Sequence, residues 1–493
     1  MTGNLEDVLP NLCALLKVRT ERLCSPALLG LAGSLAIAAA TTAAPVPNEN
    51  WPQWRGPLQN GVAPAANPPT TWSETNNVKW KVKIPGSGQA TPIVWDNRVF
   101  IQTAIPTGKK IEAKPAEASE QPPAPRPEAG GEPPRTGPGG PGGPGGGKGR
   151  GGFGGGPKPT EVYQFAILCL DRGTGKVLWQ QVGREEVPHE GYRQGEGSFA
   201  SSSGLTDGKH VFAYFGSRGL YCYDLDGKQQ WEQDLGKMRM AMGFGEGSSP
   251  VLYQDTLIVN RDNEDNSFII ALDKNTGKTL WKKPREEHTS WSTPLIIERD
   301  GKAQAVVTAT GKIRSYDVAS GEVLWECSGL TRNVIPCPVA DADRVFCMSG
   351  FQGNALLAIR LGRTGDLTGG DAIAWTHNKS TPYVPSPLLY DGKLYFFAVN
   401  NGVLSCLDTK SGDPLFEAQK LEDLPGVYAS PLGAAGRVYL PGRNGVTVVL
   451  QQSDKLEVLA TNHLDEKFEA SPAAAGKDLF LRGREYLYCI TEK

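Results

Sequence analysis

A ten-residue string recurs along this chain of 493 residues and constrains its fold more than any other feature. Leu170–Trp179 (LDRGTGKVLW) and Leu272–Trp281 (LDKNTGKTLW) are close copies, Tyr316–Trp325 and Leu407–Phe416 are weaker ones, and Tyr223–Trp231 is one residue shorter. In each copy an aspartate can accept hydrogen bonds from the backbone of a tight turn, while glycine supplies the positive φ. The strand after the turn carries an aromatic residue to bury. Strand-rich units repeated every ~40–50 residues are typical of β-propeller blades.

The turn aspartates and strand aromatics are therefore predicted to be structural residues that pack one blade against the next. None of them is assigned a catalytic role. The residues predicted to serve in this docking are Trp80, Asp171, Trp179, Trp231, Asp273, Trp281, Asp317, Trp325, Asp408 and Phe416.

A second periodic pattern counts the blades. A small-x-Pro start, in which x is any residue, is followed seven positions after the proline by an apolar residue that opens another strand. The proline suits an innermost strand, whose first residues need not donate to a ladder. The pairs are Pro92/Val99, Pro250/Leu257, Pro338/Val345, Pro387/Leu394, Pro431/Val438 and Pro472/Leu479, with Gly204/Val211 as a glycine variant and Pro294/Val306 as a longer hairpin. These eight starts predict an all-β, eight-bladed β-propeller of four-stranded antiparallel blades.

The two ends of the repeat region predict how the ring closes. Glu485–Ile490 matches the third strand of a blade, with no tryptophan-bearing strand after it, whereas Val78–Ile84 supplies such a strand near the other end. We therefore expect the propeller to span residues 78–493, after an N-terminal extension at 45–77, with the N-terminal strand closing the last blade so that no sheet edge is free. The alternative is an open seven-blade ring with a frayed tail.

Residues 1–44 have the composition of an export signal. Lys17, Arg19 and Arg22 precede an uncharged run rich in alanine and leucine, and Ala38–Ala40 offers a cleavage site. We predict a signal peptide, with an uncleaved N-terminal membrane anchor as the alternative, and hence a periplasmic or secreted protein of the bacterial cell envelope. The net charge of −2 gives no reason to expect binding to nucleic acid or to an anionic membrane.

Residues 106–160 are rich in proline and glycine and have few apolar residues to bury. We expect this segment to be a disordered insertion within the first blade. It joins the second and third strands, so it should leave the blade on the same face as the links between blades.

Cysteines occupy two kinds of position. Four fall at one register of the repeat, where small side chains are expected between packed blades: Cys169, Cys222, Cys406 and Cys489. Cys337 and Cys347 flank a predicted turn and are expected to lie opposite each other on adjacent strands. An exported location permits a disulfide there, but an unbridged pair is equally compatible with the spacing.

The repeated Asp-x-x-Thr/Ser-Gly-Lys-x-Leu-Trp unit resembles the quinoprotein (PQQ) repeat, and the motif at Trp51–Pro57 is similar to one in exported PQQ-like propeller proteins. One branch of that superfamily, the PQQ-dependent alcohol dehydrogenases, binds the quinone over the central channel with calcium, a catalytic aspartate and a disulfide between adjacent cysteines. This chain has no adjacent cysteines and no C-x-x-C-H haem motif. The other branch, of the BamB type, is an eight-bladed scaffold without a cofactor that binds proteins. This chain is similar in length but lacks a lipobox.

The loops between blades should converge around the channel and carry the functional residues. Aromatic, methionine and arginine side chains suit interface anchors. The candidate partner-binding residues are Arg193, Arg239, Met240, Trp291, Tyr383 and Tyr428. The alternation of Met238, Met240 and Met242 fits either an apolar contact surface or packing in the channel mouth. The pairs His189–Glu190 and Glu287–His288 could form a metal or acid–base set if their loops met, and solvated loop charge is the alternative.

Together these patterns predict an exported, non-enzymatic binding scaffold. We expect it to act as a monomer that engages a protein or polysaccharide partner in the cell envelope on its interblade-loop face. We expect no cofactor, no metal and no catalytic residue. The alternative is a quinoprotein alcohol dehydrogenase that uses PQQ with calcium.

Overall fold

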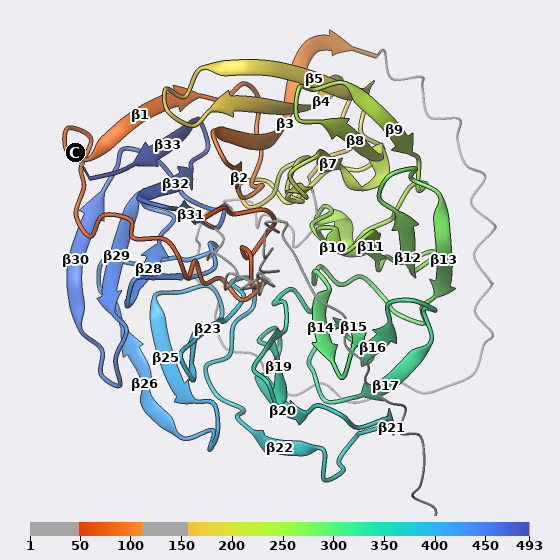
Figure 1. The fold of residues 1–493 in the computed structure, drawn as a ribbon, viewed down its shortest axis with the longest axis vertical. Helices are drawn as coiled ribbons and strands as arrows, with labels where there is room; N and C mark the ends of the chain where they lie inside the picture. Colours follow the sequence, from red (N-terminus) through yellow and green to blue (C-terminus); the bar gives the residue numbers. More distant parts are fainter. Residues whose placement is uncertain (1–48, 112–155, 493) are drawn as a thin grey trace, which may run out of the picture. The chain divides into compact units, whose positions relative to one another are not determined.

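A computed structural model describes residues 49–111 and 156–492. Within these residues thirty-two of the thirty-three strands form eight four-stranded antiparallel blades around a central channel (Figure 1), which confirms the predicted eight-bladed propeller. The helical elements described are two short 3-10 turns, η1 (Gly216–Arg218) and η2 (Ala241–Gly243). In the same part of the chain no helix is long and apolar enough to cross a membrane. The predicted signal peptide lies outside the described residues.

The first four blades follow the chain in order, each from the innermost strand outwards. Blade one contains β2 (Ile93–Trp95), β3 (Arg98–Lys110), β4 (Glu161–Asp171) and β5 (Val177–Glu186). Blade two contains β6 (Leu205–Thr206), β7 (His210–Tyr214), β8 (Leu220–Asp224) and β9 (Gln229–Gln233). Blade three contains β10 (Val251–Tyr253), β11 (Thr256–Arg261), β12 (Phe268–Asp273) and β13 (Thr279–Pro284). Blade four contains β14 (Leu295–Arg299), β15 (Lys302–Val307), β16 (Ile313–Asp317) and β17 (Val323–Cys327).

The remaining blades complete the ring. Blade five contains β18 (Val339–Ala340), β19 (Arg344–Ser349), β20 (Ala355–Arg360) and β22 (Ile373–Thr376). Blade six contains β23 (Leu388–Tyr390), β24 (Lys393–Phe397), β25 (Val403–Asp408) and β26 (Pro414–Lys420). Blade seven contains β27 (Leu432–Ala434), β28 (Arg437–Pro441), β29 (Val446–Gln451) and β30 (Val458–His463). Blade eight contains β31 (Ala473–Ala475), β32 (Asp478–Arg482), β33 (Tyr486–Ile490) and β1 (Val78–Lys83).

Blade eight closes the ring with strands from both ends of the repeat region. β1 pairs antiparallel with β33 and places Trp80 opposite Cys489 (Figure 1). This confirms the predicted closure by the N-terminal strand, and the open seven-blade alternative is wrong. All eight predicted blade starts are also present, because each innermost strand begins directly after the proline, or after Gly204 in blade two.

Outer-strand tryptophans join five pairs of neighbouring blades. Each indole N–H donates to a carbonyl oxygen in a turn of the next blade: Trp80 to Arg172 at 2.9 Å, Trp179 to Leu225 at 2.9 Å, Trp231 to Lys274 at 2.8 Å, Trp281 to Val318 at 2.9 Å and Trp375 of blade five to Thr409 of blade six at 3.1 Å. The indole ring also lies against the glycine of that turn. A Cβ atom on Gly277, whose φ is +70°, would lie 2.7 Å from the indole of Trp231. The turn itself is held by its aspartate, since Asp171 Oδ1 accepts the backbone N–H of Thr174 at 2.8 Å.

The other turn aspartates repeat this bond at similar distances, 2.8 Å for Asp273, 2.8 Å for Asp317 and 2.9 Å for Asp408. Blades four and six depart from the pattern. Trp325 donates to Gln304 of its own blade, because the following blade replaces the glycine turn with a longer connection whose strand β21 (Gly365–Asp366) pairs with β17. Phe416 has no N–H to donate and packs on Tyr395, with ring centroids 6.2 Å apart.

All seven cysteines in the described residues are buried and free. The four at the repeat register lie opposite an outer-strand aromatic residue, as in Cys169–Trp179. The predicted alignment of Cys337 with Cys347 is wrong. The ladder pairs Ala340 with Val345, one residue out of the expected register, and the Cys337 sulfur instead accepts the N–H of Thr293 at 3.0 Å.

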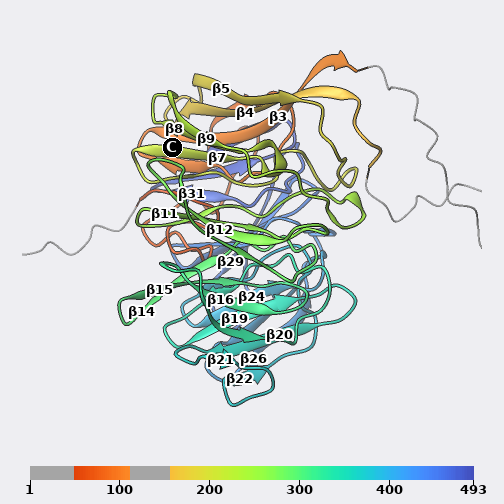
Figure 2. The same ribbon diagram turned by 90° about the vertical axis from the view of Figure 1, so that its right-hand side faces the viewer.

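β3 and β4 extend beyond the other strands of the ring (Figure 2). Residues 106–110, which we had assigned to the disordered insertion, belong to β3, and Pro106 pairs with Tyr163. Most of the predicted insertion, residues 112–155, lies outside the described residues. In a four-stranded meander the second and third strands are joined at the same end as the links between blades, so the hairpin leaves on that face.

The segment at residues 49–77 crosses the channel (Figure 1) on the face opposite the β3–β4 hairpin (Figure 2), and we call it the plug. Trp51 pairs with Val94 of blade one, and the Pro52 carbonyl accepts the N–H of Thr206 in blade two. Arg55 reaches the far side of the ring, where it donates to the carbonyls of Pro387 at 2.5 Å and Pro431 at 2.8 Å. The plug therefore closes one end of the channel.

Candidate functional site

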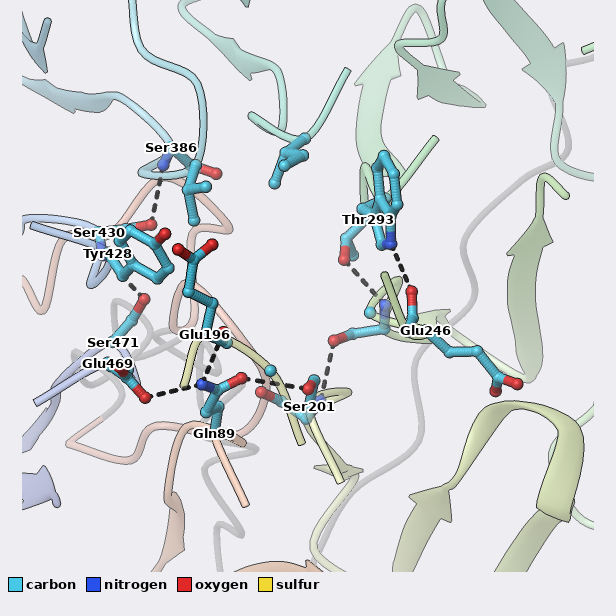
Figure 3. A pocket seen from close by; sticks show the side chains of 18 of the residues that line it. Gln89, Glu196, Ser201, Glu246, Thr293, Ser386, Tyr428, Ser430, Glu469 and Ser471 are labelled. Atoms are coloured by element: carbon cyan, nitrogen blue, oxygen red, sulfur yellow. Dashed lines mark hydrogen bonds between the residues drawn. The ribbon is translucent and has the colours of Figure 1, made fainter. Parts of the chain in front are cut away.

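The open end of the channel forms a pocket of about 200 Å³ between the plug and the interblade loops (Figure 3). Trp54 of the plug lines its closed end, and loops from several blades line its mouth. Three kinds of side chain surround the cavity: a ring of hydroxyl groups, a set of aromatic rings and three glutamates.

The hydroxyl ring arises from the residue that directly precedes each blade start. There the backbone N–H donates to the hydroxyl or thiol of the equivalent residue in the next blade. The bonds are Thr91 to Ser203 (2.9 Å), Ser203 to Ser249 (2.9 Å), Ser249 to Thr293 (2.9 Å), Thr293 to Cys337 (3.0 Å), Cys337 to Ser386 (3.0 Å), Ser386 to Ser430 (2.9 Å) and Ser430 to Ser471 (3.0 Å). These seven bonds join all eight blades at the channel wall. Our sequence analysis used the proline of each start and overlooked the polar residue before it.

The ring hydroxyls retain hydrogen-bonding capacity that faces the cavity. A serine hydroxyl has one hydrogen to donate and two lone pairs to accept with. Within the described residues four ring serines accept one backbone N–H and donate to no protein group: Ser203, Ser249, Ser430 and Ser471. All four line the pocket.

Five aromatic side chains line the pocket: Trp54, Phe244, Trp291, Tyr383 and Tyr428. Trp291 is fixed by its indole N–H, which donates to the Gly245 carbonyl at 2.7 Å. Tyr383 stacks on Phe351, with centroids 4.8 Å apart. The Arg443 guanidinium lies 4.1 Å from the centre of the Tyr428 ring. Burial raises the pKa of both tyrosines, so they are neutral at ordinary pH.

Each glutamate of the pocket is paired with arginine. Glu469 accepts hydrogen bonds from Gln89 at 2.8 Å, Arg443 at 2.6 Å and Arg484 at 2.8 Å. Burial alone would raise the pKa of Glu469, but the hydrogen bonds from Arg484, Gln89 and Arg443 outweigh it and hold the pKa below its usual value. Glu469 is therefore ionised and joins blades seven, eight and one.

The other two carboxylates are held by a residue of the same loop, for Glu196, and by the η1 turn of blade two, for Glu246. Glu196 forms an ion pair with Arg193, with 2.9 Å between Arg193 Nε and Glu196 Oε2. Glu246 accepts from Arg218 Nη1 at 2.9 Å and from the hydroxyl of Ser217 at 2.6 Å, and its carboxylate points away from Glu196 (Figure 3). The charges at the pocket are consequently matched within the protein.

This arrangement does not fit the calcium ion of the quinoprotein dehydrogenases. Calcium prefers six to eight oxygen ligands, several of them carboxylates. The pocket carboxylates are committed to arginine, and in residues 49–111 and 156–492 no group of three histidine, cysteine, aspartate or glutamate side chains is placed to hold a metal.

The histidine–glutamate pairs singled out in the sequence do not meet. His189 contacts the Met238 carbonyl at 2.7 Å, whereas Glu190 accepts the N–H of Met240. Glu287 accepts the backbone N–H of Gly311, and the exposed His288 faces Glu264 instead. The two pairs therefore do not form the metal or acid–base set that was one alternative, and His189, Glu190 and Glu287 contact the backbone of loops.

Four of the six candidate partner-binding residues line the pocket: Arg193, Trp291, Tyr383 and Tyr428. Arg239 lies outside it, exposed and ion-paired with Asp265 at 2.8 Å. Met240 is only 4% exposed, so its assignment as an interface anchor is wrong. Met238 and Met240 are buried, as the alternative of packing in the channel mouth predicts, whereas Met242 is exposed. The sequence analysis missed Trp54, Phe244 and the glutamates.

Comparison with known proteins agrees with the fold. The family described as outer membrane protein assembly factor BamB matches residues 164–418, which is more than half of the chain. The chain belongs to this family. No curated protein matches the sequence.

Solved structures of the same fold are distant in sequence. Quinohemoprotein alcohol dehydrogenase from Comamonas testosteroni has a TM-score of 0.59 and 10% identity, over 91% of this chain and 81% of that one. A europium-containing methanol dehydrogenase has a TM-score of 0.56 and 9% identity, over 90% and 91%. BamB from Moraxella catarrhalis has a TM-score of 0.46 and 14% identity, over 66% of this chain and 89% of that one. At these identities the likeness concerns the fold alone.

Proposed function

We propose that this protein is an exported, non-enzymatic binding scaffold that engages a protein or polysaccharide partner of the cell envelope through the pocket and its rim. One observation carries the proposal. Five aromatic rings line the pocket, and all three of its glutamate carboxylates are paired with arginine. Aromatic and arginine side chains at a concave centre are the usual anchors of recognition sites. Carboxylates held by arginine are poorly placed to abstract a proton or to bind a cation.

The location rests on two supports. Residues 1–44 have the composition of an export signal, and the family takes its description from an outer membrane assembly factor. Both favour a periplasmic or secreted protein. We propose that it acts as a monomer, since the closed ring leaves no blade that needs a partner strand.

The alternative function is a quinoprotein alcohol dehydrogenase. A pocket at the mouth of the channel, closed at its inner end by the Trp54 indole, favours it. The paired state of Glu196, Glu246 and Glu469 argues against it, because among the described residues that line the pocket no carboxylate is left unpaired to bind calcium or to act as a base.

The two functions are separated by one set of measurements. Purified protein is incubated with PQQ and Ca²⁺ and assayed for dye-linked alcohol oxidation and for a change in melting temperature. We expect neither turnover nor a shift. In parallel, capture of envelope components should fall with Arg193→Ala and remain with Arg239→Ala, an exposed arginine outside the pocket. Stoichiometric uptake of PQQ with turnover of alcohol would contradict the proposed scaffold function.

A further inference from the structure

We propose that the pocket binds one ring of a neutral saccharide, which assigns a ligand class to the proposed scaffold and rests on that proposed function. The hydroxyl ring, the aromatic walls and the paired charges of the pocket together favour such a ligand.

The hydroxyl ring supplies the first step. Ser203, Ser249, Ser430 and Ser471 each use one lone pair on the backbone of the preceding blade, which fixes the oxygen in place. Each keeps one hydrogen to donate and one lone pair to accept with. A sugar hydroxyl also donates and accepts, so every such contact can use both capacities. A carboxylate or phosphate would use only the donors.

The aromatic rings supply the second step. A pyranose has one face of C–H groups that packs on an indole or a phenol ring, while its hydroxyl groups point outward from the ring edge. Trp54 lies at the closed end of the pocket, and Trp291 and Tyr428 line its wall. The indole of Trp291 and the ring of Tyr428 are held by Gly245 and Arg443, so little ordering is required on binding.

The charge balance supplies the third step. Arg193 pairs with Glu196, Arg218 with Glu246, and Arg443 and Arg484 with Glu469. Arg443 and Arg484 share one carboxylate, and each of these four arginines and three glutamates already has a partner of opposite charge, so none of them is left unpaired for a charged ligand. Arg193 uses its Nε for Glu196 and keeps its terminal nitrogens as donors.

The size of the cavity limits the ligand. A volume of about 200 Å³ suits a single ring-sized group rather than an element of a folded partner. A glycan would therefore enter by one residue, with the rest of its chain over the interblade loops.

The experiment measures binding of named sugars to the full chain, which includes the plug and Trp54. Neutral hexoses, N-acetylhexosamines and their disaccharides are compared with glucuronate, galacturonate and inorganic phosphate by titration calorimetry and saturation-transfer NMR. We expect millimolar binding of at least one neutral sugar, with saturation strongest on one C–H face, and no binding of phosphate. Trp291→Ala and Ser430→Ala should each weaken binding about tenfold or more, whereas Ser430→Thr, which keeps the hydroxyl, and Arg239→Ala should bind as the parent does.

Three outcomes overturn the inference. Binding of a uronate without any neutral sugar would show that the pocket selects charge. Binding that Trp291→Ala and Ser430→Ala leave unchanged would place the sugar elsewhere. If no sugar binds while capture of a protein still depends on Arg193, the proposed scaffold function is kept and the proposed ligand class is wrong. Turnover with PQQ and Ca²⁺ would instead contradict the scaffold function itself.

Discussion

Arg482 is a buried cation without a hydrogen-bond partner among the described residues. Arg482 is 1% exposed, and none of its three guanidinium nitrogens has an acceptor among the described residues. Burial lowers the pKa of Arg482 to about 10, and Glu466 offsets this only in part. Arg285 is the contrasting case, because its guanidinium is also fully buried but pairs with Asp262 at 2.6 Å.

The two arginines should respond oppositely to replacement by methionine, which keeps volume and removes charge. Arg482→Met should stabilise the protein by about 1–4 kcal/mol, because a charge without a partner leaves the interior. Arg285→Met should cost about 3–5 kcal/mol, since it leaves the Asp262 carboxylate buried and unpaired. Urea unfolding at pH 7 measures both. A loss of stability in Arg482→Met would mean that its guanidinium has a partner, such as ordered water.

Glu469 makes the pocket sensitive to acid. Its pKa is lower in the folded protein than in the unfolded chain, so its contribution to stability is complete above the unfolded value of about 4.3 and is lost as pH falls through the folded value. Glu469→Gln should therefore cost about 1–3 kcal/mol at pH 7, and the difference from the parent should shrink towards pH 3. Unfolding free energies across that range measure it, with Glu485→Gln, an exposed carboxylate paired with Lys83, as the control that changes little.

At the scale of the strand, the outer-strand tryptophan determines how firmly neighbouring blades join. Trp80 is 8% exposed and donates to Arg172 of blade one, so it joins the two blades where the ring closes. Trp80→Ala should cost about 3–5 kcal/mol, and unfolding should remain a single transition because the whole ring depends on this junction. Lys83→Ala on the same strand, 68% exposed at its side chain, should change little. A separate early transition in Trp80→Ala would show that blade eight frays alone.

The blades could be predicted because their turns are local. An aspartate, a hydroxyl residue and a glycine within five positions specify a turn whatever the rest of the chain does. The docking tryptophan of blade five could not be predicted in this way. The outer strand of this blade carries Trp375, which donates to Thr409 at 3.1 Å, but no aspartate–glycine turn precedes it and β21 occupies the connection.

The pocket was harder to predict because it consists of loops. Trp291, Tyr383 and Tyr428 could be chosen by residue type, yet a loop has no period that tells which side chains face inward. Met240 illustrates this, because alternation with charged residues suggested exposure and the residue is buried. Trp54 could not be predicted for a different reason. The residues around it in the sequence do not indicate that this segment crosses the propeller.

At the scale of the whole molecule the plug joins parts of the ring that are otherwise distant. Gln59 accepts the N–H of Ile296 in blade four, while Arg55 donates to blades six and seven and is 3% exposed. Trp51 and Pro52 hold the same segment to blades one and two. A change at Arg55 should therefore loosen one side of the channel and leave the other in place.

We expect Arg55→Ala to cost about 2–4 kcal/mol, because two buried carbonyls lose their donor and a cavity remains. Amide exchange should quicken in β23 and β27, which follow Pro387 and Pro431, and stay unchanged in β2 and β6. Leu58→Ala, 53% exposed in the same plug, is the control and should alter neither. Because Trp54 adjoins Arg55 and lines the pocket, the variant should also weaken ligand binding. Uniform exchange around the ring would contradict this, since it would mean that the plug stabilises all blades alike.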